Sequence, residues 1–295
     1  MFLHHDRQNF LGARYKSLFT KRVLDCCMLL TGAAAFILLS KVSVAASIPC
    51  ADNPGALCYG DFMGNTVMYL NVREEATTVG DEEPLFGEPT ISGDSLDFDP
   101  IGFDASATNG SSDITDSNLS FTVMAKPLHV IKNLTLSEAG DTTLIGLAPA
   151  NAYSSVTAAV FVDILEVDGA GVALPGSNFS MLFTPSDGDY DLITDGGGGP
   201  RYHTIWTGSL LVDVMGILDA AVANGDIPPY NVGATKISIN MDNTLTALSE
   251  VGTFAVIAKK DAGGISITVN IPEPTSLALA GLCLLAFGLA RRSGR

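Results

Sequence analysis

Four aspartates lie close together in the segment DGDYDLITDGGGG, and their spacing suits a cation site. Asp187, Asp189 and Asp191 occupy alternate positions, and Asp195 precedes four glycines. Carboxylate oxygens at alternate positions of a tight loop are ligands that Ca²⁺ prefers. The segment is not an EF-hand, because Leu192 stands where that loop requires glycine. The pattern therefore allows a Ca²⁺ site, with a solvated surface loop as the alternative.

The aromatic pair Tyr202 and Trp206 is a second group whose chemistry could serve a ligand. Aromatic rings offer flat apolar faces, so the pair can be interpreted as a platform for sugar rings. Packing of the chain's single tryptophan in the core is the alternative. Beyond residue 46 the sequence has two histidines, His129 and His203, and it lacks the G-x-S-x-G and H-E-x-x-H motifs. We therefore expect no catalytic residue.

Cysteine usage predicts one disulfide. Cys26 and Cys27 lie in the N-terminal apolar segment and Cys283 lies in the C-terminal one, which leaves Cys50 and Cys58 between them. An even number of cysteines in an exported chain is typical of disulfide pairing. The expected bond would close the short loop CADNPGALC at the N-terminal edge of the fold. Two free or metal-bound thiols are the alternative, although no CxxC motif supports a metal.

The C-terminal residues combine three features that indicate a membrane-processed end. A Pro-Glu-Pro triplet at 272–274 precedes the uncharged run 277–290, and Arg291 and Arg292 follow at once. Prolines on both sides of the glutamate prevent helix or sheet pairing there. As a helix, residues 275–290 would reach about 24 Å, and basic residues stay on the cytoplasmic side. We expect a short inner-membrane helix with the triplet exposed outside.

This three-part tail resembles the PEP-CTERM sorting signal. The matching positions are Pro272, Glu273, Pro274, the run 275–290, Arg291, Arg292 and Arg295. The resemblance implies recognition by an exosortase in the inner membrane of a Gram-negative bacterium and cleavage near the triplet. It also implies delivery to the cell surface or to an exopolysaccharide matrix. The resemblance covers residues 272–295, and an ordinary single-pass anchor is the alternative.

Residues 1–46 have the features of a secretory signal. A basic segment precedes the uncharged run 26–39, and the small residues of VSVAAS follow, so cleavage is expected after Ala46. As a helix the uncharged run would reach about 21 Å, which is less than a hydrocarbon core of about 30 Å. We expect export and cleavage by signal peptidase. An uncleaved anchor helix is the alternative.

The body at 47–271 is acidic and predicts an all-β fold. The chain carries a formal net charge of −16, which disfavours nucleic acid as a partner because phosphate binding needs clusters of Lys and Arg. Short alternating apolar segments predict a β-sandwich, of jelly-roll type as one option. The expected strands occupy residues 66–72, 119–125, 130–137, 142–147, 156–167, 179–184, 202–207, 236–245, 253–259 and 265–271.

Two further elements can be predicted in the body. In residues 209–225, Leu211, Val214 and Leu218 share one face at helical spacing, and Gly225 supplies a helix end. This pattern predicts one amphipathic helix lying on the sheet. The last two strands alternate well, and the DAGG sequence between them predicts a hairpin turn.

These features lead to two hypotheses about function. The first is a non-enzymatic exported protein with a signal peptide at 1–46, an acidic domain at 47–271 and a sorting signal at 272–295, placed at the cell surface or in the matrix. The second is a carbohydrate-binding or carbohydrate-acting β-sandwich with Ca²⁺ at the aspartate loop. Both share signal peptidase, exosortase and the inner membrane as processing partners.

Overall fold

A computed structural model describes residues 48–260 of this protein and the backbone of residues 265–270. We call these ranges together the two-sheet body. The predicted signal peptide at 1–46 and the predicted sorting signal at 272–295 lie outside the described residues. Within the described ranges, no helix has both the length and the apolar character needed to cross a membrane.

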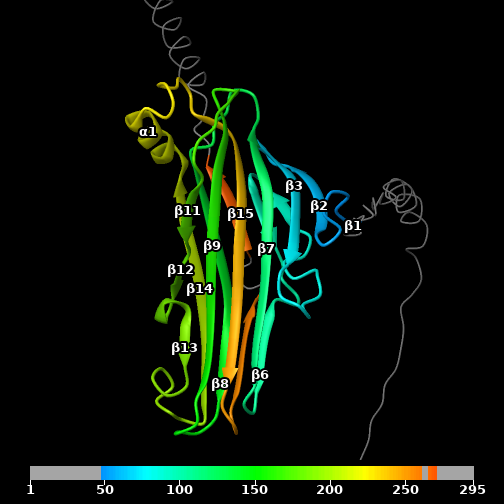
Figure 1. Cartoon of the computed structure of the whole chain (residues 1–295), viewed down its shortest axis with the longest axis vertical. Coiled ribbons are helices and arrows are strands. Elements are labelled where there is room, and N and C mark those ends of the chain that lie inside the picture. Colours follow the sequence, from blue (N-terminus) through cyan, green and yellow to red (C-terminus); the bar gives the residue numbers. More distant parts are fainter. Residues whose placement is uncertain (1–47, 261–264, 271–295) are drawn as a thin grey trace, which may run out of the picture. The chain divides into compact units, whose positions relative to one another are not determined.

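The first sheet contains the longest strands. Its order is β1-β2-β3-β7-β15-β9-β10, β11 and β13 also pair with β9, and all neighbours are antiparallel. Figure 1 shows β7, β15 and β9 side by side. The bounds are β1 (Ile48–Pro49), β2 (Leu57–Met63), β3 (Val67–Ala76), β7 (Ser112–Ala125), β9 (Ala152–Val167), β10 (Ala170–Gly171), β11 (Ser177–Ser180), β13 (Asp189–Asp191) and β15 (Ala234–Ser249).

The second sheet is also antiparallel. Its order is β12-β14-β8-β17-β5-β4, and β16 pairs with both β8 and β6. The bounds are β4 (Thr90–Ser92), β5 (Ser95–Phe98), β6 (Asp104–Thr108), β8 (Asn133–Ile145), β12 (Leu182–Thr184), β14 (Arg201–Asp213), β16 (Phe254–Lys259) and β17 (Ile265–Asn270).

One hydrophobic core contains side chains from both sheets. Ile237, Ile239 and Met241 are fully buried at alternate positions of β15, and Leu134 and Leu136 are buried in the same way on β8. Alternate residues of a strand face the same side of its sheet, so each sheet presents an apolar face to this core. Full burial of each such side chain contributes about 1.5–3 kcal/mol. This shared burial holds the two sheets together.

The expected all-β class with one helix in the described part is confirmed, but the helix is shorter than predicted. The helix α1 (Val214–Asn224) begins after Asp213, and the predicted residues 209–213 belong to β14, where they pair with β8. Leu210, Leu211 and Val212 fit a strand as well as a helix, and pairing with β8 decides between the two. The Asp213 carboxylate caps α1 by accepting a hydrogen bond from the backbone N–H of Gly216.

The predicted hairpin between the last two strands is wrong. β16 pairs with residues 140–145 of β8, and β17 pairs with residues 133–137 of the same strand. The other edge of β16 is occupied by β6, so β17 has no free edge of β16 to pair with. The two strands therefore follow one another along β8 in the same direction.

Other strand boundaries also differ from the prediction. Residues 130–137 and 142–147 were expected as two strands, whereas the single strand β8 spans residues 133–145 without a break and includes most of both ranges. The strands β1, β2, β4, β5, β6, β10 and β13 are additional to the predicted set. Several of them are only two to four residues long, which is too short for an alternating pattern to be recognised. The jelly-roll connectivity stays a prediction.

Gly140 on β8 lies between β14 and β16, its two neighbouring strands in the second sheet, and it has no room for a side chain there, which leads to a first prediction. A Cβ at this position would lie 2.1 Å from the backbone oxygen of Ala258 and 2.2 Å from the ring of Trp206. Backbone cannot move aside as a flexible side chain can, so we expect Gly140→Ala to lower the free energy of unfolding by about 3 kcal/mol. Urea denaturation would measure the change.

Gly171 in β10 provides the matched control. The nearest atom to its Cβ position, apart from its chain neighbours, is the Leu165 oxygen at 4.0 Å. We expect Gly171→Ala to change the free energy of unfolding by less than about 0.5 kcal/mol. Equal effects of the two substitutions would contradict the close packing described at Gly140.

Candidate functional site

The predicted aspartate loop is built around Asp191, which organises the turn that follows β13. Its Oδ1 accepts hydrogen bonds from the backbone N–H groups of Ile193 and Thr194, each at 2.8 Å. Its Oδ2 accepts one from the Asn151 side chain at 2.6 Å. Burial acts to raise the pKa of Asp191, but the hydrogen bonds from Thr194, Asn151 and Ile193 outweigh it and hold the pKa below its ordinary value.

The other aspartates of the loop have separate partners. Asp189 accepts a hydrogen bond from the Tyr153 hydroxyl on β9, and Asp195 accepts one from the backbone N–H of Asp191 at 2.8 Å. Asp187 lies in a short 3-10 turn, η1 (Ser186–Gly188), and is exposed. The loop carboxylates thus stabilise the loop itself, as the surface-loop alternative expects. The Ca²⁺ site at these residues stays a prediction.

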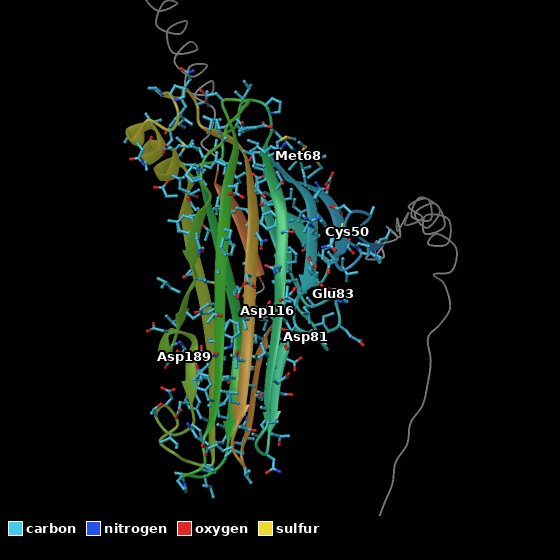
Figure 2. The ribbon with its side chains drawn as sticks, viewed as in Figure 1. Cys50, Met68, Asp81, Glu83, Asp116 and Asp189 are labelled. Atoms are coloured by element: carbon cyan, nitrogen blue, oxygen red, sulfur yellow. A yellow bond between two sulfur atoms is a disulfide. The ribbon has the colours of Figure 1, made fainter. Side chains whose placement is uncertain are left out.

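Cys50 and Cys58 form a disulfide in the structure, with a Cα–Cα distance of 5.1 Å. The bond lies at the edge of the first sheet, where β1 pairs with β2. In the described ranges, one group of three potential metal ligands lies within 4.8 Å of one another, and it consists of these two cysteines and Asp52. Because both sulfurs are bonded to each other, this group offers no thiolate to a metal. Figure 2 shows that Cys50 and Asp189 lie on separate parts of the body.

The predicted aromatic platform does not form, because Trp206 is completely buried. Its ring packs edge-on against Phe183 with 5.8 Å between centroids, and it covers Gly140. Tyr202 lies on the same strand and is half-buried. With neither face exposed, Trp206 cannot stack on a sugar ring. The core-packing alternative describes its position.

A buried polar triad, Lys259, Glu138 and Asn243, lies inside the core and was not predicted from the sequence. Nζ of Lys259 donates to Glu138 Oε2 at 2.5 Å and to Asn243 Oδ1 at 2.7 Å. The Asn243 amide in turn donates to Glu138 Oε1 at 2.8 Å. The side chains of Lys259 and Glu138 are 0% exposed, and Asn243 is 0% exposed. Each member of the triad therefore contacts the other two without access to solvent.

Three strands from both sheets supply the triad. Glu138 comes from β8, Lys259 ends β16, and Asn243 comes from β15 in the opposite sheet. All three occupy core-facing positions in their strands' alternating burial patterns. One signal in the sequence could have identified them. In each strand the residues that face the core at every second position are mostly apolar, and a polar residue at one of these positions marks a buried polar group. Because these strands were predicted from their apolar residues alone, the triad was not predicted.

Two aromatic rings lie beside Lys259, and it is its burial that disfavours charge. Its Nζ lies 4.8 Å from the ring centroid of Phe103 and 5.8 Å from that of Phe86. Complete burial lowers the pKa of Lys259, and this effect outweighs the opposing attraction of the Glu138 carboxylate. Phe86 is held in place by Glu74, whose carboxylate accepts the backbone N–H groups of Leu85 and Phe86 at 2.7 Å each.

Comparison with known families decides the identity of the C-terminal segment. Residues 270–292 match the model of the PEP-CTERM protein-sorting motif. The chain carries a PEP-CTERM sorting signal. The matched range contains Pro272, Glu273, Pro274, Arg291 and Arg292, which confirms the resemblance inferred from these residues. The motif indicates an exported protein whose C-terminus is processed by an exosortase.

The other comparisons add no argument about the body. No curated protein matches the chain. Among solved structures, the enzymatically active domain of tailspike protein 4 from bacteriophage CBA120 is 13% identical, with a TM-score of 0.19. The match covers 72% of this chain and 19% of that one. At this level of similarity, neither fold nor function can be transferred.

The Asp191 carboxylate gives a prediction about pH. Because folding lowers its pKa below 3.8, its stabilisation is fully present above about pH 4 and is lost as the pH falls through the lowered value. We expect Asp191→Asn to lower the Tm near neutral pH by about 2 °C. The difference from the wild type should shrink on acidification below about pH 4, as measured by thermal melts across the pH range.

The exposed Asp187 supplies a matched control in the same loop. Its backbone has a φ of 52°, a left-handed conformation that asparagine tolerates, so Asp187→Asn should leave the melting curves unchanged. A wild-type minus Asp191→Asn difference that stays constant down to pH 2 would contradict the assigned role of the Asp191 charge.

Proposed function

We propose that this protein is a non-enzymatic component of the bacterial cell surface or extracellular matrix, delivered there by exosortase processing of its C-terminus. The observation that carries the proposal is the match of residues 270–292 to the PEP-CTERM sorting motif. The secretory signal predicted at residues 1–46 supplies the first step, export and cleavage by signal peptidase.

The order of residues in the tail explains how sorting would proceed. The apolar run 277–290 is short for a stable membrane span, so it suits a temporary anchor. Arg291 and Arg292 hold the end on the cytoplasmic side. The Pro-Glu-Pro triplet then lies outside the membrane as an extended segment, which an embedded protease can bind. Cleavage near the triplet releases the acidic domain, residues 47–271.

The body is suited to a structural role outside the cell. Its two antiparallel sheets share one core, which fits a β-sandwich, and its acidic composition favours solubility and disfavours nucleic acid as a partner. Exopolysaccharide is the partner expected from the sorting route. The second hypothesis, a carbohydrate-binding or carbohydrate-acting domain with Ca²⁺, would need a surface other than Trp206, because that ring is buried.

The tail arginines provide the test of sorting. We expect Arg291→Glu combined with Arg292→Glu to leave the tail poorly retained at the membrane, so that the C-terminus stays uncut. The intact mass of the protein recovered from surface and cell fractions of the native host would report both chain ends. The wild-type surface form should lack the residues after the triplet.

The matched control moves the same charge change into the body. Lys132 and Arg201 are both exposed, and Lys132→Glu combined with Arg201→Glu should leave processing intact. Wild-type protein recovered from the surface with Arg295 still attached would overturn the proposal. Normal processing of the Arg291 and Arg292 variant would overturn the role given to these two residues.

A further inference from the structure

We propose that Lys259 and Asn243 become joined by an amide bond between their side chains, formed by the folded body itself with Glu138 as the proton carrier. The nucleophile, the electrophile and the base are all present in the buried triad and touch one another. The inference goes beyond the proposed function and does not rest on it, because the triad lies in the body and not in the sorting signal.

The first requirement for such a bond is contact between the amine and the amide. Lys259 Nζ lies 2.7 Å from Asn243 Oδ1, and Oδ1 is bonded to Cγ, the carbon that the amine would attack. The two residues come from strands in opposite sheets, so the packed core holds them at this contact. Fixing two reactants in position replaces a bimolecular encounter by an effectively unimolecular step.

The second requirement is a neutral amine, since an ammonium group has no lone pair with which to attack. Complete burial lowers the pKa of Lys259 and thereby favours the neutral form. Glu138 Oε2 lies 2.5 Å from Nζ and can take the proton. The aromatic rings of Phe86 and Phe103 next to Nζ help to keep water from the site.

The third requirement is a proton for the leaving nitrogen. Glu138 Oε1 lies 2.8 Å from Asn243 Nδ2, the atom that must leave. One carboxyl group therefore contacts the nucleophile through one oxygen and the leaving group through the other. It can accept a proton from Nζ and deliver it to Nδ2, which is the work of a general base followed by a general acid.

The reaction balances without any other reactant. The lone pair of the neutral Lys259 amine attacks Cγ of Asn243, and a new C–N bond forms. One hydrogen of the amine passes through Glu138 to Nδ2, the bond between Cγ and Nδ2 breaks, and ammonia leaves. Glu138 returns to its starting state. The products are one secondary amide and one ammonia molecule, and nothing is oxidised or reduced.

The product would connect the two layers of the fold covalently. β15 belongs to the first sheet and β16 to the second, so a bond from Asn243 to Lys259 would cross the core and close a loop over residues 243–259. A cross-link of this kind constrains the unfolded chain in the way a disulfide does. Unlike a disulfide, an amide is not opened by reducing agents.

The experiment is mass spectrometry of the purified full chain after reduction of the disulfide. We expect an intact mass lower, by one ammonia, than the mass calculated for the chain ends found. Proteolysis should yield a single species in which the peptide containing Asn243 is joined to the peptide containing Lys259. Separate peptides and a full calculated mass would show that the triad is only a buried ion pair, and this would overturn the proposal.

Variants distinguish this bond from other losses of ammonia. Asn109-Gly110 and Asn224-Gly225 can lose ammonia by forming a backbone succinimide, but that loss leaves no joined peptides. Lys259→Met and Asn243→Ala should each restore the full mass at the triad. Glu138→Gln keeps the side-chain shape and should slow or abolish joining. Complete joining in Glu138→Gln would overturn the role of Glu138.

Two further measurements guard against variants that fail to fold. Lys236 on β15 forms a partly buried ion pair with Glu166 at 3.4 Å, away from the triad, and Lys236→Met should leave the joined peptides unchanged. In Asn243→Asp the same attack would expel water, so the joined product should have the same mass as joined wild type. Wild-type peptide mapping needs no variant and decides the proposal by itself.

Discussion

A lysine and a glutamate are costly to bury inside a protein core unless each meets the other there, and in this body Glu138 meets Lys259. Moving one charged group from water into the core costs several kcal/mol even after the protein relaxes, and moving its partner costs roughly as much again. The two residues must therefore face each other across neighbouring strands. A shift of β16 by one residue along β8 would turn Lys259 to the opposite face of its sheet. The pair consequently fixes the register of β16, and Asn243 extends the same constraint to β15.

A second buried carboxylate, Glu74, positions an aromatic ring beside the triad. Burial raises the pKa of Glu74, while hydrogen bonds from the backbone of Leu85 and Phe86 act in the other direction. These bonds place Phe86 edge-on to Phe103, with 5.1 Å between ring centroids, beside the Lys259 amine. Glu74, a side chain of the first sheet, thus positions the segment at Leu85 and Phe86 that lies beside the triad. The triad itself is positioned by strands of both sheets.

The sequence was sufficient for the class of fold and for the sorting signal, because both depend on local patterns. Alternation located the long strands, and the Pro-Glu-Pro triplet with its terminal arginines identified the tail. Pairing between distant strands could not be predicted, and for this reason the hairpin of β16 and β17 was wrong. Leu211 and Val212 fit helix and strand alike. The burial of Trp206 and of the triad depends on which face of each strand packs against the core. Packing between the sheets decides that face, and composition does not reveal it.

The arrangement of β16 and β17 along β8 has a mechanical consequence. The described body ends at Asn270, and β17 pairs there with Asn133. Tension applied from the C-terminal side would enter along the axis of β17 and load its hydrogen bonds to β8 together, in shear. A hairpin pulled from its open end would instead unzip one bond at a time. A protein tethered by its C-terminus, even briefly, would gain resistance to pulling from this geometry.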